Sequence, residues 1–195
     1  NKPDHTTILP FTRLICAPMD YTSGIFNLKD YRYNSPDDRT INTNHHIPST
    51  ISKELAHYVV IYAPVQMAAD LPENYKGNPA FQFILDVPTD WEETKILNGE
   101  IGKYITTVRK DRNSDDWYLG SITNENARKL DVQMSFLESG KEYNATIYKD
   151  PIDGGWEAKP EEVIISNVQF KQGDQYTIEL PPGGGQAIRF TPQSQ

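Results

Sequence analysis

The spacing of apolar residues divides the chain into a helical first part and a strand-rich second part. Within residues 50–70, apolar side chains such as Ile51 and Leu55 recur every three or four positions, the spacing of one helical face. From Trp91 onward the spacing falls to two, which is typical of strands. The pattern predicts two kinds of structure that meet near residues 86–93.

The predicted helix has a clear start and an interruption. Ser49 or Thr50 is suited to cap its first turn, because a hydroxyl oxygen can accept a hydrogen bond from a free backbone N–H there. Pro64 removes a backbone donor and clashes with the preceding turn, so we expect a kink or break near residues 61–62. A shorter helical or mixed segment, AFQFILDV, follows before Pro88.

The second part contains seven or eight short segments rich in β-branched and aromatic residues. Turn-forming residues such as Asn98-Gly99 and Asp153-Gly154-Gly155 separate them. This spacing predicts an antiparallel β-sandwich. The expected strands are Ile101–Val108, Trp117–Thr123, Leu130–Leu137, Tyr143–Tyr148, Val163–Val168, Gln175–Leu180 and Ala187–Phe190.

The first 48 residues are harder to assign. The near-continuous apolar run from Thr6 to Ile15 suits a strand buried on both faces as well as a short helix. Residues 27–48 are polar and rich in Pro, Asp and Asn, which predicts a long loop, and such loops are often functional. The chain opens at Asn1 in what reads as a loop leading into a strand, and it shows no signal-peptide pattern. We therefore expect a processed or truncated piece of a larger protein.

Composition excludes several classes of protein. The 195 residues carry 27 acidic and 19 basic side chains, a net charge of −8, which argues against non-specific nucleic-acid binding. No stretch approaches the roughly 20 apolar residues of a membrane-spanning helix. A single cysteine, Cys16, excludes an internal disulfide framework and a thiolate zinc cluster. The length fits one domain or two small ones.

Two pairs of side chains are candidates for chemistry. Asp4 and His5 place a carboxylate beside an imidazole, which suits acid–base catalysis or a metal, although a solvated terminal pair is the simpler interpretation. Asp20 and Tyr21 follow an apolar run where it meets a turn. Such a pair would face the active site of a parallel barrel, or the aspartate would cap the turn.

The remaining polar and aromatic residues favour structural roles. We expect a surface pair at His45-His46, a core or flanking position for His57, and a helix stop with capping at Asp70 and Glu73. Cys16 is expected to be a buried small hydrophobe, and residues 183–185 a sandwich turn. The three tryptophans are expected in the core rather than on a sugar-stacking platform. On these signals alone, the chain is an α/β remnant joined to a β-sandwich, with its function open.

Five segments resemble conserved motifs of glycoside hydrolase family 97. HTTILPFTRLICAPMDYTSGIF (5–26) is similar to the family's HxTxLPFTRxxxGPMDYTPGxF. YVVIYAPVQMAADLPENY (58–75) resembles its YVVYYSPLQMAADLPENY. Segments 86–110, 117–137 and 181–190 resemble DVPxDWxxTxxLxGExGxYxxxARR, WFxGxxTxExxRxLxxxLxFL and PxGGGxAxRF. The matches occur in order over essentially the whole chain.

The resemblance implies a composite α+β fold. Residues 1–88 would be the last strands and helices of a (β/α)₈ barrel, and residues 89–195 a C-terminal antiparallel β-sandwich. Since a full barrel takes roughly 200–250 residues, an upstream part of the same enzyme would have to complete it. Family members are α-glucosidases and α-galactosidases, mostly from Bacteroidetes and commonly periplasmic or secreted.

The resemblance also implies a chemistry. Two carboxylic groups would hydrolyse the terminal α-linked sugar of an oligosaccharide, with calcium held nearby by oxygen ligands. Asp4 stands where the family usually has glutamate, a position associated with the acid and the calcium ligands. His5, Asp20 and Tyr21 would contact the sugar. The base or nucleophile would lie upstream, so we expect the isolated chain to be inactive.

Two departures and one alternative accompany this interpretation. Ser23 replaces the family's proline and Ala17 its glycine, so the loop around Asp20 is expected to differ in conformation.

The alternative to the glycosidase interpretation is a stand-alone carbohydrate-binding or structural β-sandwich module without catalysis. The apolar runs Ile8–Ile15 and Val59–Met67 argue against it, because an autonomous module would expose them.

Overall fold

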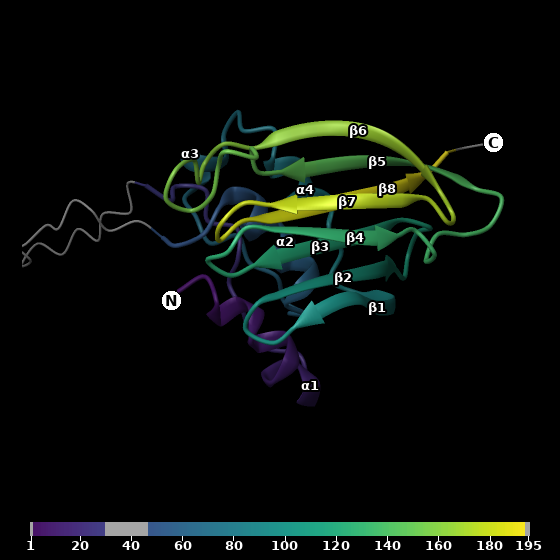
Figure 1. Ribbon diagram of the computed structural model, residues 1–195, viewed down its shortest axis with the longest axis horizontal. Helices are drawn as coiled ribbons and strands as arrows, with labels where there is room; N and C mark the ends of the chain where they lie inside the picture. Colours follow the sequence, from purple (N-terminus) through teal and green to yellow (C-terminus); the bar gives the residue numbers. More distant parts are fainter. Residues whose placement is uncertain (1, 30–46, 194–195) are drawn as a thin grey trace, which may run out of the picture.

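A computed structural model describes residues 2–29 and 47–193. Its centre is a six-stranded antiparallel sheet in the order β1-β2-β3-β8-β5-β6, with helices on one face and a two-stranded β4-β7 ribbon on the other (Figure 1). The mostly antiparallel, sandwich-like second part agrees with the prediction. The strands are β1 (Trp91–Glu100), β2 (Tyr104–Asp111), β3 (Trp117–Thr123), β4 (Arg128–Gln133), β5 (Glu142–Lys149), β6 (Ile164–Lys171), β7 (Gln175–Leu180) and β8 (Gly185–Pro192).

The helical elements are short, with one exception. They are the 3₁₀ turns η1 (His5–Thr7) and η2 (Leu9–Phe11) and the helices α1 (Arg13–Cys16), α2 (Ile51–Val60), α3 (Pro72–Tyr75) and α4 (Phe81–Asp86). No helix among the described residues is long and apolar enough to cross a membrane.

Helix α2 begins as predicted and ends earlier than its apolar pattern. The Thr50 hydroxyl accepts the Lys53 N–H at 3.1 Å, which confirms the predicted N-cap. The helix stops at Val60, whose carbonyl lies four residues before Pro64, where the proline ring would clash with it. Ile61 is already extended. The break predicted near residues 61–62 is therefore confirmed, and the apolar spacing of residues 61–70 does not form helix.

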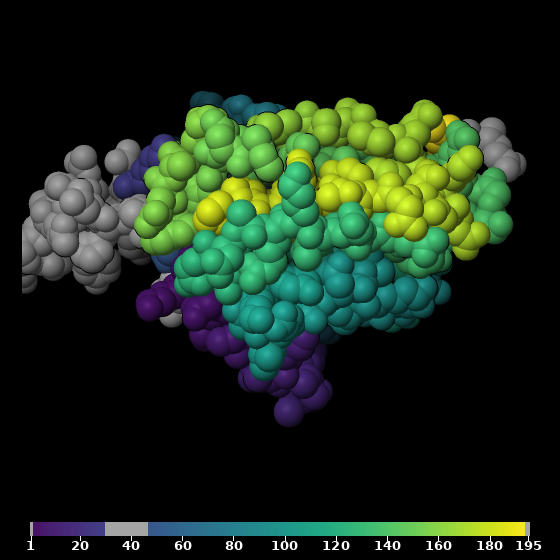
Figure 2. Space-filling view, in the orientation of Figure 1, coloured from purple at the N-terminus to yellow at the C-terminus, as the bar shows by residue number. Residues whose placement is uncertain are grey.

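The apolar run at the N-terminus forms turns instead of a buried strand. Threonine hydroxyls donate to nearby backbone carbonyls there. Thr7 donates to the Asp4 carbonyl oxygen at 2.6 Å, and Thr12 donates to the Ile8 carbonyl oxygen at 3.0 Å. The following helix α1 projects beyond β1 (Figures 1 and 2). Cys16 is exposed there, so the expectation of a buried cysteine is wrong for this chain.

Helix α2 lies so close to the sheet that only glycine fits beneath it. A Cβ added at Gly120 of β3 would lie 2.6 Å from the Ala56 carbonyl oxygen, and one at Gly185 of β8 would lie 2.5 Å from the Lys53 Cα. Because the N-terminal segments cover its other side, every residue of α2 is buried. The helix therefore joins the two parts of the chain.

The opposite face of the sheet carries a second core. Leu130 and Val132 of β4 and Ile178 of β7 pack there against Trp117 and Phe190. Figure 2 shows the β4-β7 ribbon lying across this face. Trp117 is buried here, and Trp91 is buried in the core on the helical face, as predicted. Trp156 is only partly buried and belongs to neither core, so the prediction is wrong for this residue.

Strand prediction succeeded for β3 and for β7 of the ribbon, and it failed at the β1 edge of the sheet. The bounds of β3 and β7 are those predicted. The pattern missed β1, since this edge strand is exposed at most positions and shows no alternation. Ile101, predicted to begin a strand, lies in the β1–β2 turn.

Candidate functional site

A cavity of about 330 Å³ lies where the N-terminal segments meet the first turns of α2. Residues from segments 2–6, 21–25 and 47–57 line it, together with Ala69. Its walls thus combine parts of the chain that the sequence alone does not bring together.

The predicted site residues lie on or beside this cavity. Tyr21 is half-buried and lines it, while Asp20, immediately before, is exposed. Pro3 also lines it, and Asp4 and His5 follow at the start of η1, half-buried and exposed respectively. The structure therefore brings the Asp4 and Tyr21 segments to one cavity, although Asp4, His5 and Asp20 are not part of its wall.

Tyr21 packs against the histidine of α2. The ring centroids of Tyr21 and His57 are 5.6 Å apart in an edge-to-face arrangement. Burial, and to a lesser extent the Glu54 charge, raises the pKa of Tyr21 above its ordinary value. The phenol therefore keeps its proton and can both donate and accept a hydrogen bond, as recognition of a sugar hydroxyl requires. His57 is buried, which confirms its predicted place in the core or at its flank.

Glu54 is an ionised carboxylate whose oxygens are already engaged. Burial alone would raise its pKa, but the neighbouring His57 and hydrogen bonds from Ser49 and Gly24 hold the pKa below its ordinary value. The His57 Nδ1 lies 3.5 Å from the Glu54 Oε1. Within the described parts of the chain, neither ring nitrogen of His57 has a hydrogen-bond partner. Glu54 is thus suited to holding backbone rather than to donating a proton.

Lys53 is the second charged group in the cavity wall. Burial lowers its pKa to about 8, although several carboxylates, Glu54 first among them and Asp4 included, favour the charged form. The sequence analysis missed both Lys53 and Glu54. Their only signal was a pair of adjacent charges inside an apolar helical run.

The other candidates have structural roles or lie outside the described residues. Asp70 accepts the backbone N–H groups of Phe26 and Asn27 at 2.8 and 2.7 Å, and also that of Leu71 before α3. Because α2 already ends at Val60 and α3 has no side-chain cap, the predicted helix stop with capping at Asp70 and Glu73 is wrong, and Asp70 instead holds the backbone of residues 26–27. Residues 183–185 form the turn into β8, as expected. The pair at residues 45–46 lies outside the described residues.

The described residues offer no complete metal site. Across 2–29 and 47–193, no three or more His, Cys, Asp or Glu side chains converge in a way that could hold an ion. Asp4 alone cannot supply the roughly six to eight oxygen ligands that a calcium ion takes. We therefore assign no chemical step to calcium from this chain.

The sheet and the segments around the cavity together have a fold that is similar to part of solved family 97 enzymes. The chain belongs to glycoside hydrolase family 97: the family model described as "Glycosyl-hydrolase 97 C-terminal, oligomerisation" matches residues 90–191, which hold all eight strands but the last residue of β8.

Relatives extend the match over the whole chain. A retaining alpha-galactosidase of Bacteroides thetaiotaomicron is 35% identical over 95% of this chain and 27% of its own length. A family 97 enzyme of Pseudoalteromonas sp. strain K8, solved in complex with panose, is 43% identical with a TM-score of 0.89 over 100% of this chain and 29% of its own. The same enzyme has been solved with acarbose. The chain thus spans less than a third of the length of these relatives.

Proposed function

We propose that this chain works as the C-terminal part of an α-glycosidase that removes terminal α-linked glucose or galactose from oligosaccharides. The observation that carries the proposal is that the match to family 97 enzymes covers all of this chain, the segments around the cavity as well as the sandwich. In this proposal residues 1–88 are the end of a catalytic (β/α)₈ barrel that begins upstream, and residues 89–195 are the sandwich that follows it.

Exposed apolar side chains in the first part support an upstream partner. Ile15 is 74% exposed and Val65 70%, values that are costly in water for side chains of this size. In the proposal the upstream part of the same enzyme covers them. The further members of this group are Met67, Leu71 and Leu85.

Asp4 is the carboxyl group that this chain contributes to the chemistry. Glycoside hydrolysis uses one carboxylic acid to protonate the leaving oxygen and a second carboxylate, here from the upstream part, to attack the sugar or activate water. Asp4 fills the first role or binds calcium beside it. His5, Asp20 and the protonated phenol of Tyr21 contact sugar hydroxyls at the rim.

The first test measures hydrolysis by the longest natural form of the protein that contains this chain. Panose and p-nitrophenyl α-glucoside form one arm, and melibiose and p-nitrophenyl α-galactoside the other. Each arm is run with added calcium and after chelation. Hydrolysis in one arm names the sugar, and loss of that activity on chelation supports the calcium proposal. No turnover in either arm would refute the glycosidase proposal.

A variant of Asp4 then separates its two roles. If Asp4 is the acid, Asp4→Asn should lower turnover of panose by about 10²- to 10⁴-fold. The p-nitrophenyl substrate should suffer far less, because its leaving group departs without a proton. A ligand role predicts an equal loss on both substrates that is relieved by more calcium. Unchanged activity would exclude both roles.

Export and assembly complete the proposal. By its family resemblance we propose a periplasmic or secreted location. Immunodetection in periplasmic and culture-fluid fractions of the source organism tests this location.

The name of the family model favours a second, structural role for residues 90–191, which is to hold copies of the protein together in an oligomer. Sedimentation of the chain at several concentrations tests this role, and a monomer throughout would contradict it.

A further inference from the structure

The first turn of α2 carries two adjacent charged side chains that are both buried. Lys53 is 1% exposed and Glu54 6%. Charged groups are rarely buried to this extent unless hydrogen bonds compensate the lost hydration. The partners of these two side chains therefore show what the pair does.

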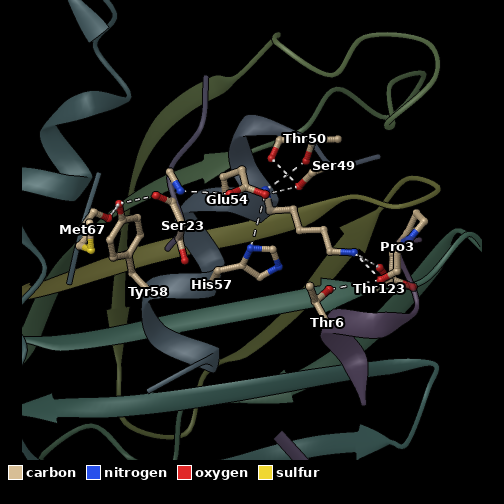
Figure 3. Close-up of polar contacts among 12 residues, drawn as sticks. Pro3, Thr6, Ser23, Ser49, Thr50, Glu54, His57, Tyr58, Met67 and Thr123 are labelled. Atoms are coloured by element: carbon tan, nitrogen blue, oxygen red, sulfur yellow. Dashed lines mark hydrogen bonds and ion pairs between the residues drawn. The ribbon is translucent and has the colours of Figure 1, made fainter. Parts of the chain in front are cut away.

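Lys53 connects the start of the chain to the centre of the sheet. Its Nζ donates to the Pro3 carbonyl oxygen at 2.9 Å and to the Thr123 carbonyl oxygen at 2.8 Å (Figure 3). Pro3 directly precedes Asp4, and Thr123 is the last residue of β3. The ammonium group thus fixes the backbone beside Asp4 against a strand of the sandwich.

Glu54 holds the other segment that reaches the cavity. Its Oε2 accepts the Gly24 N–H at 3.0 Å, and its Oε1 accepts the Ser49 hydroxyl at 2.6 Å. Gly24 has a φ of +88°, and a Cβ there would meet the Tyr58 hydroxyl at 2.3 Å. The Tyr58 hydroxyl also donates to the Ser23 carbonyl oxygen at 3.1 Å (Figure 3). The backbone just after Asp20 and Tyr21 is therefore held closely against α2.

We propose that Lys53 and Glu54 are positioning residues, which set the placement of Asp4 relative to Asp20 and Tyr21. Because Lys53 and Glu54 are adjacent on one helix, they hold the Pro3 and Gly24 backbones at a fixed separation. The sheet in turn fixes the helix. Neither side chain touches the substrate. The inference rests on the proposed glycosidase function for its kinetic effect, but the restraint on the two segments is independent of it.

The kinetic test compares variants in the longest natural form of the protein. Lys53→Met removes both donors and Glu54→Leu removes both acceptors, and each should lower kcat/KM by about 10- to 100-fold, since misplacement by an ångström has that effect. Glu54→Gln keeps an acceptor for Gly24 and should stay within about threefold of wild type. The double variant should be no worse than the poorer single one, because both changes disturb the same separation.

A matched control separates positioning from loss of stability. Val60→Ala truncates a buried residue at the far end of the same helix, beside Gly120 of β3, and removes none of the hydrogen bonds to the two segments. It should therefore lower the melting temperature and leave kcat/KM near wild type. If Val60→Ala loses as much activity as Glu54→Leu at equal folded fraction, the inference is overturned. Full activity of both Lys53→Met and Glu54→Leu would overturn it as well.

Hydrogen exchange tests the restraint even if the enzyme acts on none of the sugars. Peptides covering residues 2–8 should exchange faster in Lys53→Met, and those covering residues 18–26 faster in Glu54→Leu, each relative to Val60→Ala. Equal exchange in all three variants would refute the positioning role. Selective exchange without any glycosidase activity in wild type would refute only the proposed function.

Discussion

The buried carboxyl of Asp150 should contribute stability at low pH that is lost as pH rises through the acidic range. Asp150 follows β5 and is 3% exposed. Its Oδ2 accepts the Gly185 N–H at 2.9 Å and the Thr50 hydroxyl at 3.0 Å, while its Oδ1 has no hydrogen-bond partner within the described residues. Burial raises its pKa to about 7, although these bonds and the Lys53 charge favour ionisation.

The size of the effect follows from the difference between the folded and unfolded pKa values. The pKa rises from 3.8 to about 7 on folding. At about 1.4 kcal/mol per pKa unit, this corresponds to as much as about 4 kcal/mol. Below the unfolded value both states hold the proton. Between the two values only the folded state holds it, so the free energy of unfolding decreases with pH and levels off above about 7.

Asp150→Asn isolates this contribution, because its amide oxygen can accept the same two hydrogen bonds and does not ionise. Urea unfolding of wild type and variant from pH 3.5 to 7.5, followed by tryptophan fluorescence, gives the difference in unfolding free energy at each pH. That difference should shift in favour of the variant by up to about 4 kcal/mol across the range.

A control and a refuting result complete this test. Asp153 is exposed, and its hydrogen bond with Lys159 lowers its pKa, so Asp153→Asn should show a small trend of opposite sign. A difference between wild type and Asp150→Asn that does not vary with pH would mean that the folded protein carries an ionised Asp150. The reasoning from burial would then be wrong.

Three further predictions concern packing and exposure. Gly120→Ala should lower the free energy of unfolding in urea by about 1–3 kcal/mol, because the added Cβ meets the backbone of α2. Gly99→Ala should lower it less, because its Cβ meets only the end of the Phe11 ring, which can move. Equal losses of unfolding free energy would contradict the close packing of α2 on β3. Arg109→Met should lower the free energy of unfolding by about 1–3 kcal/mol, since the Arg109 Nε donates at 2.6 Å to the Val59 carbonyl oxygen in the last turn of α2. A stability equal to that of wild type would mean that this hydrogen bond does not stabilise the end of α2. The exposed Cys16 thiol of this 195-residue chain should react with a thiol reagent in the folded state, and protection until unfolding would contradict that exposure.

Much of the sandwich could be predicted because its central strands carry local information. Trp117–Thr123 is apolar and bounded by turn residues, so its limits follow from composition. β1 could not be predicted in the same way, since an edge strand with charged, exposed residues has no buried face to impose alternation. The N-cap at Thr50 was predictable because capping depends on neighbours three residues away.

The candidate site was predictable only in part. The Asp4 and Asp20 segments were recognised from short motifs. Lys53 and Glu54 were not, because a helical pattern places charged residues in solvent. Their burial depends on carbonyl and amide groups at Pro3, Gly24 and Thr123, which are 50, 30 and 70 residues away in sequence. No local pattern contains that information.

The place of β8 in the sheet has a consequence for synthesis of the protein. β8 pairs with both β3 and β5, so it joins β1-β2-β3 to β5-β6. Until the ribosome has released Gly185–Pro192, the six-stranded sheet can exist only as two separate pieces with open edges. Helix α2, which packs on β3 and β8 together, also lacks part of its docking surface until then. Closure of the six-stranded sheet is therefore expected to wait until β8 has left the ribosome.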